Sequence, residues 1–277
     1  MTLTQQSRAA NPVLRKTVVP VRRMLDLIVA GAGLIILAPV MALVAVAIWV
    51  ESGRPIIFSQ VRLGLLGRHF RIYKFRKFHK RIAAAGCGVT VRGDVRLSAV
   101  GRFLGSAKLD ELPQLWNILK GDMSIVGPRP ESLHFADCIV RDYRGVLECK
   151  PGIFGPNQVY FRDEGSLFPE ACDPEEFYRE VLFPIKAQID LAYFPNRTFA
   201  ADIGWIVRSV LVVFGVRLFP RKFNAMLVRW LDQQDPQEPA HCQLLRTGCR
   251  QVSLEAGSVS WQGGEPACQN NSMSIEP

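Results

Sequence analysis

Residues Leu27–Val50 read LIVAGAGLIILAPVMALVAVAIWV, an apolar run that carries no charged side chain and has Pro39 at its middle. An α-helix rises about 1.5 Å per residue, so this run would reach about 36 Å, enough to cross a hydrocarbon core of about 30 Å. It is too long for a signal peptide and lacks a convincing small-residue cleavage site before the basic stretch that follows. The run therefore predicts a segment that enters a membrane.

Basic residues flank the apolar run on both sides. Those before it are Arg15, Lys16, Arg22 and Arg23. After it, no acidic residue interrupts a basic series between Glu51 and Asp94. Because basic loops stay on the cytoplasmic side, both flanks are typical of that side. A helix that breaks near Ala38-Pro39 and returns to the same face would satisfy both flanks, since proline removes a backbone donor and clashes with the preceding turn. The alternative is an ordinary spanning helix that tolerates its proline.

The composition favours an anionic partner. The chain has 277 residues and a formal net charge of +9, which allows one main domain with extensions and attracts acidic lipid, phosphate-bearing substrates or nucleic acid. The adjacent apolar run favours the lipid. Seven cysteines without a Cys-x-x-Cys pair indicate reduced thiols rather than a disulfide framework.

Local patterns predict a hairpin and a later helix start. Two β-type segments, residues 56–58 and 70–73, lie on either side of a glycine-rich turn at residues 64–67. This arrangement predicts a small hairpin near the membrane surface. Further along, Asp173 at a capping position followed by Pro174 predicts the start of a helix.

Two apolar stripes precede a polar tail. Residues 203–216 are apolar apart from Arg208 and a few small or hydroxyl residues, and apolar residues recur at helical spacing over 223–231. Such stripes are typical either of helices in the membrane interface or of ordinary core packing. From residue 232 onward the chain is rich in Gln, Pro, Gly, Ser and Asn, and this composition predicts a disordered tail.

The first chemistry-competent residues are Asp110 and Glu111, in the stretch LDELPQLWNIL at residues 109–119. The leucines and the tryptophan recur on one helical face, and Pro113 is tolerated only in a first turn, so both acids are expected at a helix N-terminus. Unpaired N–H groups there favour anions and an ionised carboxylate, as a nucleophile or a metal ligand requires. Simple helix capping is the alternative reading.

The following stretch adds a carboxylate and a fixed cation. Asp122 follows Gly121, and Arg129 stands in the rigid turn Gly-Pro-Arg-Pro at residues 127–130. An arginine held in this way can grip a phosphate with two hydrogen bonds. Carboxylates, a fixed arginine and upstream cations are the parts that phosphoryl transfer uses, although a structural salt bridge would also explain Arg129.

Three stretches in this order resemble the bacterial sugar transferase family, the monotopic phosphoglycosyl transferases. They are Lys74-Phe75-Arg76, LDELPQLWNILKGDMSIVGPRPE at residues 109–131, and Lys150-Pro151-Gly152-Ile153, and the resemblance covers about residues 20–160. It implies transfer of a sugar 1-phosphate from a nucleoside diphosphate sugar, expected to be a UDP-sugar, to polyprenyl phosphate. Such a reaction begins the assembly of a surface glycan or exopolysaccharide. The resemblance also implies Mg²⁺ and a proline-broken re-entrant helix.

The resemblance assigns roles to residues of this chain. Asp110 would attack the β-phosphorus, form an aspartyl phosphosugar and contact the metal, and Glu111 would act as a general base or shape the metal site. The phosphate-binding residues would be Lys74, Arg76, Arg102 and Arg129. Asp122 and Lys150 would support the site. Ala38 and Pro39 would form the bend in the membrane.

The implied fold is α+β, a monotopic protein with a re-entrant helix, a small hairpin and a mostly helical cytoplasmic catalytic domain. The expected divisions are a basic leader at 1–22, the membrane helix at 23–51, a catalytic domain with interfacial helices at 52–231 and the tail at 232–277. The implied location is the bacterial inner membrane, with the catalytic domain on the cytoplasmic face and inner-membrane lipid as a partner. The sequence leaves the oligomeric state and the sugar open.

The chain departs from the family pattern at several positions. Ala38 stands where a serine usually precedes the bending proline, and a serine hydroxyl would help the bend by bonding a freed carbonyl. Lys77 and Phe78 replace the usual residues after the Lys-Phe-Arg triplet. These changes bear on the sugar preference more than on the reaction.

Two other classes of function fit part of the sequence. A non-enzymatic membrane adaptor would use the basic juxtamembrane cluster to bind acidic lipid or partners, but it would not explain the acids and the arginine gathered at residues 110–129. A single-stranded nucleic-acid binder would use the basic and aromatic residues at 70–81. Because that cluster adjoins a membrane segment, no nucleic-acid partner is expected.

Overall fold

The computed structural model describes residues 12–79, 89–91, 93–168, 173–216, 252–253 and 260–261. Within these residues the protein is a mixed helical and β structure with small sheets, as expected. The apolar stripe predicted at 223–231 lies outside the described residues. So does the tail expected at 232–277, apart from two short paired strands, β5 (Val252–Ser253) and β6 (Ser260–Trp261).

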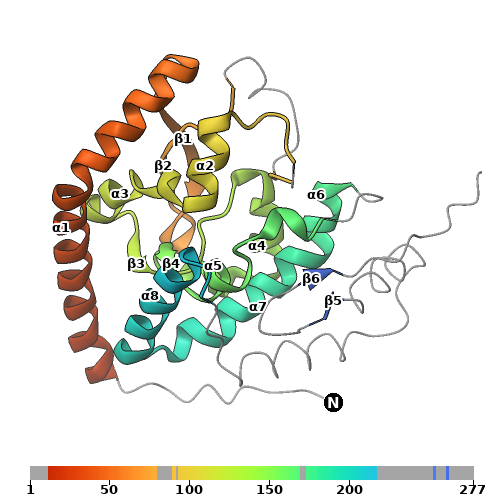
Figure 1. Cartoon of the computed structure of the whole chain (residues 1–277). Coiled ribbons are helices and arrows are strands. Elements are labelled where there is room, and N and C mark those ends of the chain that lie inside the picture. The colour runs from red at the N-terminus through yellow and green to blue at the C-terminus, as the bar shows by residue number, and fades with distance from the viewer. Residues whose placement is uncertain are drawn as a thin grey trace, which may run out of the picture.

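The first element is a single long helix, α1 (Pro12–Ser52), which begins within the stretch expected as a leader. The helix is continuous through Ala38 and Pro39, so it does not break there as predicted. Its ribbon instead changes direction near the middle (Figure 1). A bend of this kind is what a proline causes when the helix continues past it.

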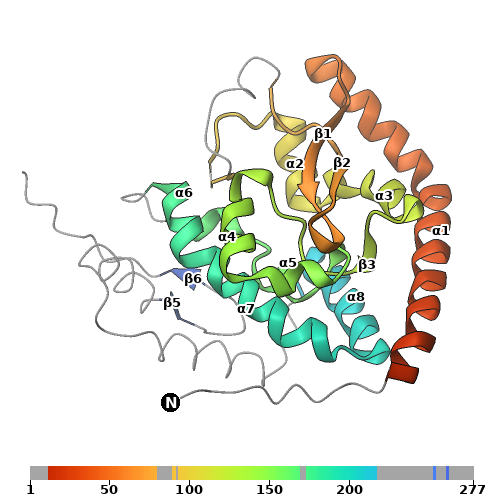
Figure 2. The same ribbon diagram turned by 180° about the vertical axis from the view of Figure 1, so that it is seen from behind.

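Helix α1 lies along one side of the molecule in both views (Figures 1 and 2). One face of it packs into the protein through Ala30, Val44 and Ile48, which are buried. The opposite face remains apolar and open, with Ile35 78% and Val50 75% exposed. A helix that is apolar on both faces but packed on only one is suited to contact lipid with the other.

The predicted hairpin is confirmed. Strand β1 (Ile57–Leu63) pairs antiparallel with β2 (His69–Phe75), and the 3₁₀ turn η1 (Leu65–Gly67) joins them. A second, parallel pair consists of β3 (Ser124–Val126) and β4 (Gly152–Phe154). These two short sheets carry the loops that form the candidate site.

Helices fill most of the remaining domain. The α-helices are α2 (Ala99–Ala107), α3 (Gln114–Lys120), α4 (Ala136–Asp142), α5 (Pro156–Tyr160), α6 (Pro174–Phe177), α7 (Phe183–Tyr193) and α8 (Phe199–Val213). The shorter turns are η2 (Leu109–Glu111), η3 (Leu133–Phe135), η4 (Arg144–Glu148), η5 (Glu164–Ser166), η6 (Tyr178–Leu182) and η7 (Phe194–Asn196). The predicted helix start is confirmed, since the side chain of Asp173 accepts hydrogen bonds from the N–H groups of Glu175 and Glu176.

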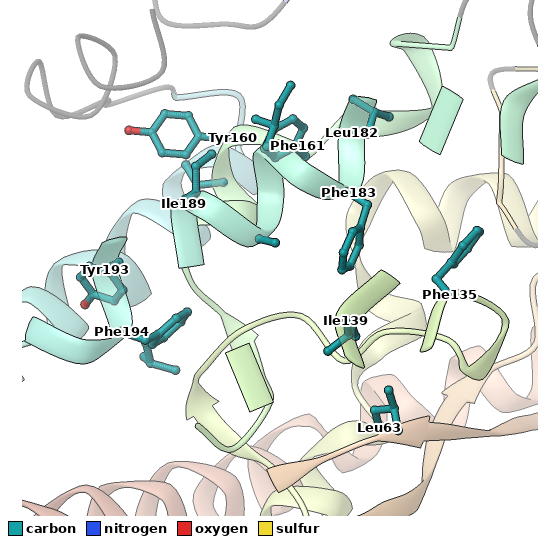
Figure 3. Close-up of a cluster of buried hydrophobic side chains, with 14 of the residues drawn as sticks. Leu63, Phe135, Ile139, Tyr160, Phe161, Leu182, Phe183, Ile189, Tyr193 and Phe194 are labelled. Atoms are coloured by element: carbon teal, nitrogen blue, oxygen red, sulfur yellow. The ribbon is translucent and has the colours of Figure 1, made fainter. Parts of the chain in front are cut away.

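The core gathers side chains from distant parts of the chain. Leu63 of β1, Ile139 of α4 and Phe183 of α7 point into the same interior (Figure 3). A smaller cluster beside it joins Val44 and Ile48 of α1 to other elements. Because α1 contributes to both clusters, the membrane helix is part of the folded domain rather than a separate anchor.

Side-chain bonds fix α1 to this domain just before the apolar run begins at Leu27. Arg22 Nε lies 2.9 Å from Asp202 Oδ2 of α8, and Arg23 donates to the carbonyl oxygens of Ile118 and Leu119 at 2.6 and 2.9 Å. Asp26 is buried and accepts from Ile125 N at 2.8 Å and from Ser124 Oγ at 2.9 Å.

The other end of α1 is fixed in the same way. Arg76 Nη2 donates to Ser52 O at 2.9 Å, to Ser52 Oγ at 2.7 Å and to Gly53 O at 2.8 Å. Glu51 Oε1 accepts from Val100 N at 2.9 Å. Both flanks of the apolar run of α1 are therefore bonded to one folded body.

Candidate active site

The acidic pair lies in the turn η2, one helical turn directly before α3. Lys108, with a left-handed φ of 57°, ends α2 and begins η2, so the chain reverses there and carries the pair inward. Asp110 is 1% and Glu111 8% exposed. In the described part of the chain, neither carboxylate accepts a hydrogen bond from the backbone of α3. Helix capping therefore does not account for this buried pair.

Glu111 is held by two cations that come from different elements. Lys74 Nζ of β2 lies 3.0 Å and Arg129 Nη2 3.2 Å from Glu111 Oε1. Burial alone would raise the pKa of Glu111, but the charges of Lys74, Arg129 and Lys108 outweigh it and hold that pKa well below its usual value. Glu111 is therefore ionised and acts as the anchor of the two cations.

Asp110 has a different environment. Lys77 Nζ lies 3.1 Å from its Oδ2. Among the residues that the structure describes, Oδ1 of Asp110 has no hydrogen-bond partner although it is buried. An unpaired buried carboxylate oxygen is costly, and such groups recur where a ligand or a reacting atom belongs.

The cations around the pair are themselves partly desolvated. Burial lowers the pKa of Lys74 to about 8, although the charge of Glu111 opposes this shift. Burial also lowers the pKa of Lys108. The pKa of Arg129 is raised, first by Glu111 and despite its burial. Four cations thus surround two carboxylates.

The position of Arg129 depends on two glycines in touching backbones. A Cβ at Gly127 would overlap the carbonyl oxygen of Lys150, and a Cβ at Gly152 would overlap Gly127. The Gly-Pro-Arg-Pro turn can therefore lie against the start of β4, which directs Arg129 toward Glu111. Arg129 was expected to bind phosphate, with a structural salt bridge as the alternative. It does form a salt bridge, and its partner Glu111 is itself a predicted residue of the site.

Several residues predicted for the site do not contact the acidic pair. Arg76 donates to the end of α1, and Arg102 is exposed and donates to Leu97 O at 3.4 Å. Asp122 pairs with Lys120 at 2.8 Å beyond the far end of α3. Lys150 lies near the turn at Gly121. Ala38 and Pro39 are on the exposed face of α1. Roles for these residues stay predictions.

Sequence reasoning missed Lys77 and Lys108 as members of the site. The place where β2 ends decides which basic residue reaches the site. If the strand continued, residues 74 and 76 would lie on one face of it, but β2 ends at Phe75. Beyond that point the chain turns, so Lys77 rather than Arg76 reaches the acidic pair.

A divalent metal has one available ligand here. No group of three or more His, Cys, Asp or Glu side chains that could hold a metal occurs among the described residues. Mg²⁺ does not need one, because it keeps several waters and binds through one or two carboxylates together with substrate phosphates. Neither carboxylate oxygen of the buried Asp110 has a hydrogen-bond partner in the described structure, so this carboxylate fits that mode, whereas Glu111 is occupied by its cations.

Comparison with known proteins adds to this geometry. A family model described as bacterial sugar transferase matches residues 17–216. The UDP-N-acetylgalactosamine-undecaprenyl-phosphate N-acetylgalactosaminephosphotransferase of Aeromonas hydrophila is 34% identical over 205 residues, 71% of this chain and 45% of that protein. The UDP-glucose:undecaprenyl-phosphate glucose-1-phosphate transferase of Caulobacter vibrioides is 40% identical over 155 residues, 55% of this chain and 58% of that protein.

A shorter relative is covered more fully. The sugar transferase EpsL of Bacillus subtilis is 31% identical over 199 residues, which are 71% of this chain and 90% of that protein. The chain spans about half the length of the first two relatives. The region that the family model matches includes the acidic pair and its cations.

Proposed function

This chain belongs to the bacterial sugar transferase family, and from that premise we propose that it transfers a sugar 1-phosphate from a UDP-sugar to polyprenyl phosphate. The observation that carries the proposal is the buried Asp110, whose Oδ1 is unpaired in the described structure while cations surround it. Four cations and two carboxylates leave two excess positive charges, which match the two negative charges of the donor's diphosphate.

The proposed reaction has two displacements at phosphorus. Oδ1 of Asp110 attacks the phosphorus next to the sugar, forms an O–P bond and displaces UMP, which leaves with the electron pair of the broken bond. An oxygen of polyprenyl phosphate then attacks the same phosphorus and releases the Asp110 carboxylate. Splitting one difficult displacement into two easier ones is the advantage of covalent catalysis.

The cations stabilise the charge that develops on the phosphate oxygens. Lys74 and Arg129 are fixed by Glu111, so they need no reorganisation when the donor binds. Lys77 contacts the attacking carboxylate itself. Mg²⁺, held by Asp110 and the substrate phosphates, would supply further neutralisation of the diphosphate.

We propose that Glu111 positions Lys74 and Arg129 rather than acting as a general base. A good general base has a pKa near the working pH. The pKa of Glu111 is held well below its usual value by Lys74, Arg129 and Lys108, although its burial opposes this. The roles expected for this residue were general base and shaping of the metal site, and the positioning of two cations is proposed in place of both.

We also propose that α1 enters the membrane and returns to the same face. Asp26 and Glu51 flank the apolar run of α1, about 37 Å apart along the helix, and both bond to the one domain. A helix that crossed the bilayer would carry its far end and the bonded domain through the hydrocarbon. On this arrangement the protein lies on the inner membrane with its catalytic domain in the cytoplasm.

Helix α8 supports contact with the lipid surface. Its exposed apolar residues recur at helical spacing along one side, namely Phe199, Ile203, Val207 and Val210, and Phe214 directly after the helix is exposed too. The opposite side is buried through Trp205 and Val212. Helix α8 also lies beside the first half of α1 in both views (Figures 1 and 2). The stripe is therefore placed to rest in the headgroup region.

The experiment that tests the proposed function offers the purified full chain a panel of nucleotide sugars with polyprenyl phosphate and Mg²⁺. We expect release of the nucleoside monophosphate with one or a few UDP-sugars, and none without the lipid phosphate beyond a single turnover. Failure of every donor would contradict the proposal and favour a non-enzymatic adaptor.

The topology has a separate test. In a variant without native cysteines, single cysteines at position 8 and position 68 would be exposed to a membrane-impermeant thiol reagent in sealed vesicles. The re-entrant arrangement predicts labelling from the same side. Labelling from opposite sides would show that α1 spans the bilayer.

A further inference from the structure

A buried lysine lies outside the residues assigned above. The side chain of Lys186 in α7 is only 4% exposed. Its Nζ lies 2.8 Å from Tyr178 Oη, 3.2 Å from Glu164 Oε1 and 3.6 Å from Glu131 Oε1. A buried ammonium group is expensive unless it is paired. These partners account for its charge but leave open why a charged group is placed there.

The local helix geometry directs this lysine and Tyr178 to one place. Residues eight apart differ by about 80° around an α-helix that turns about 100° per residue. Residues Tyr178–Leu182 form a π-helical turn, which takes up one extra residue. The π-turn brings Tyr178 and Lys186 onto about the same face, where Lys186 Nζ also lies 4.7 Å from the centre of the Tyr178 ring.

The carboxylates that pair with Lys186 also act on Arg129. Glu131 follows Arg129 after a single proline, and the charges of Glu164, Glu131 and Tyr178 add to that of Glu111 in raising the pKa of Arg129. The Arg129 guanidinium thus pairs with Glu111 at 3.2 Å while the charges of two further carboxylates also act on it. Arg62 also acts on Glu131, but without Lys186 the freed charge of Glu164, together with Glu131, would compete with Glu111 for Arg129.

We infer that Lys186 is a positioning residue, which occupies Glu131 and Glu164 and so leaves Arg129 to face Glu111 and the donor's diphosphate. This inference rests on the proposed function for the identity of the ligand. Lys186 itself does not touch the substrate on this account. Its effect is exerted through Arg129.

The test measures the dissociation constant of UDP for the full chain in detergent, by calorimetry, so that no turnover is needed. We expect Lys186→Met to weaken binding about tenfold, because a charge-assisted contact of Arg129 is lost. In an Arg129→Gln background the same change is expected to alter binding less than about twofold, since residues that act through one another are not additive. Lys120→Met, an exposed lysine of α3, is the matched control and should bind as the wild type does.

Rescue separates positioning from packing. Adding Glu164→Gln to Lys186→Met removes one of the freed carboxylates and should restore most of the affinity. If Lys186→Met does not fold, Tyr178→Phe takes its place, because it removes the 2.8 Å hydrogen bond to Lys186. It is expected to weaken UDP binding in the wild-type background but not in the Arg129→Gln background.

The outcomes are distinct. Equal losses in the wild-type and Arg129→Gln backgrounds, or no loss in either, would overturn the inference. A wild type that binds no UDP would overturn it too. The wild type could bind UDP and the variants could show the expected losses while the wild type transfers no sugar phosphate. That result would support the inference and contradict the proposed function.

Discussion

Lys77 Nζ lies 3.1 Å from Oδ2 of Asp110, while Arg76, its neighbour in sequence, donates to the carbonyl oxygens at the end of α1. Two adjacent cations therefore have separate tasks. One belongs to the acidic pair, and the other fixes the membrane helix.

Replacing Lys77 tests the first task. Lys77→Met removes the cation beside the proposed nucleophile and is expected to lower kcat/KM by about tenfold to hundredfold, the range for a charge-assisted contact. Activity within about twofold of the wild type would show that the contact with Asp110 has no part in transfer.

Replacing Arg76 tests the second task. Arg76→Met loses the three hydrogen bonds to Ser52 and Gly53, and we expect it to lower the free energy of unfolding by about 1–3 kcal/mol. The KM for the nucleotide sugar should stay close to that of the wild type at temperatures where the variant is folded. Arg54→Met, at an exposed position, is the control. A raised KM with unchanged stability would instead favour the phosphate-binding role expected from the sequence.

The pH dependence follows from Lys74. Its pKa is lowered to about 8 by burial, so the free enzyme loses this positive charge as the pH rises through about 8. We expect kcat/KM for the nucleotide sugar to fall above that pH. An arginine at position 74 keeps its positive charge, so Lys74→Arg should move this fall in kcat/KM to higher pH, whatever it does to the highest value of kcat/KM. A fall at the same pH in the wild type and in Lys74→Arg would show that another group causes it.

Much of the arrangement is local in origin and could be predicted. The hairpin follows from short β-type segments around glycines, and the acidic pair follows from a leucine stripe with Pro113 in its first turn. The tasks of Arg76 and Lys77 were not predictable, because they depend on where β2 ends. Lys186 was missed because the π-turn that directs it leaves no periodic signal, and its partners Glu131 and Glu164 are distant in the chain.

The close contact of Gly127 with the backbone before β4 gives a prediction about stability. Gly127→Ala would overlap Lys150 O and is expected to destabilise the fold by about 2 kcal/mol or more, and to displace Arg129. Gly31→Ala is the matched control, because a Cβ at that position of α1 meets nothing within 4 Å. Urea or thermal unfolding in detergent would compare the two variants. Equal stability would contradict the close packing of the turn against β4.

The central claim is that Asp110 forms a covalent bond to the sugar phosphate. The direct measurement incubates the protein with the active UDP-sugar, labelled at the phosphorus next to the sugar, without polyprenyl phosphate, and then counts label bound to the denatured chain. The wild type should acquire label that polyprenyl phosphate removes, and Asp110→Asn should acquire none, with transfer lowered at least about thousandfold. Label on Asp110→Asn, or transfer by that variant at the wild-type rate, would contradict the account.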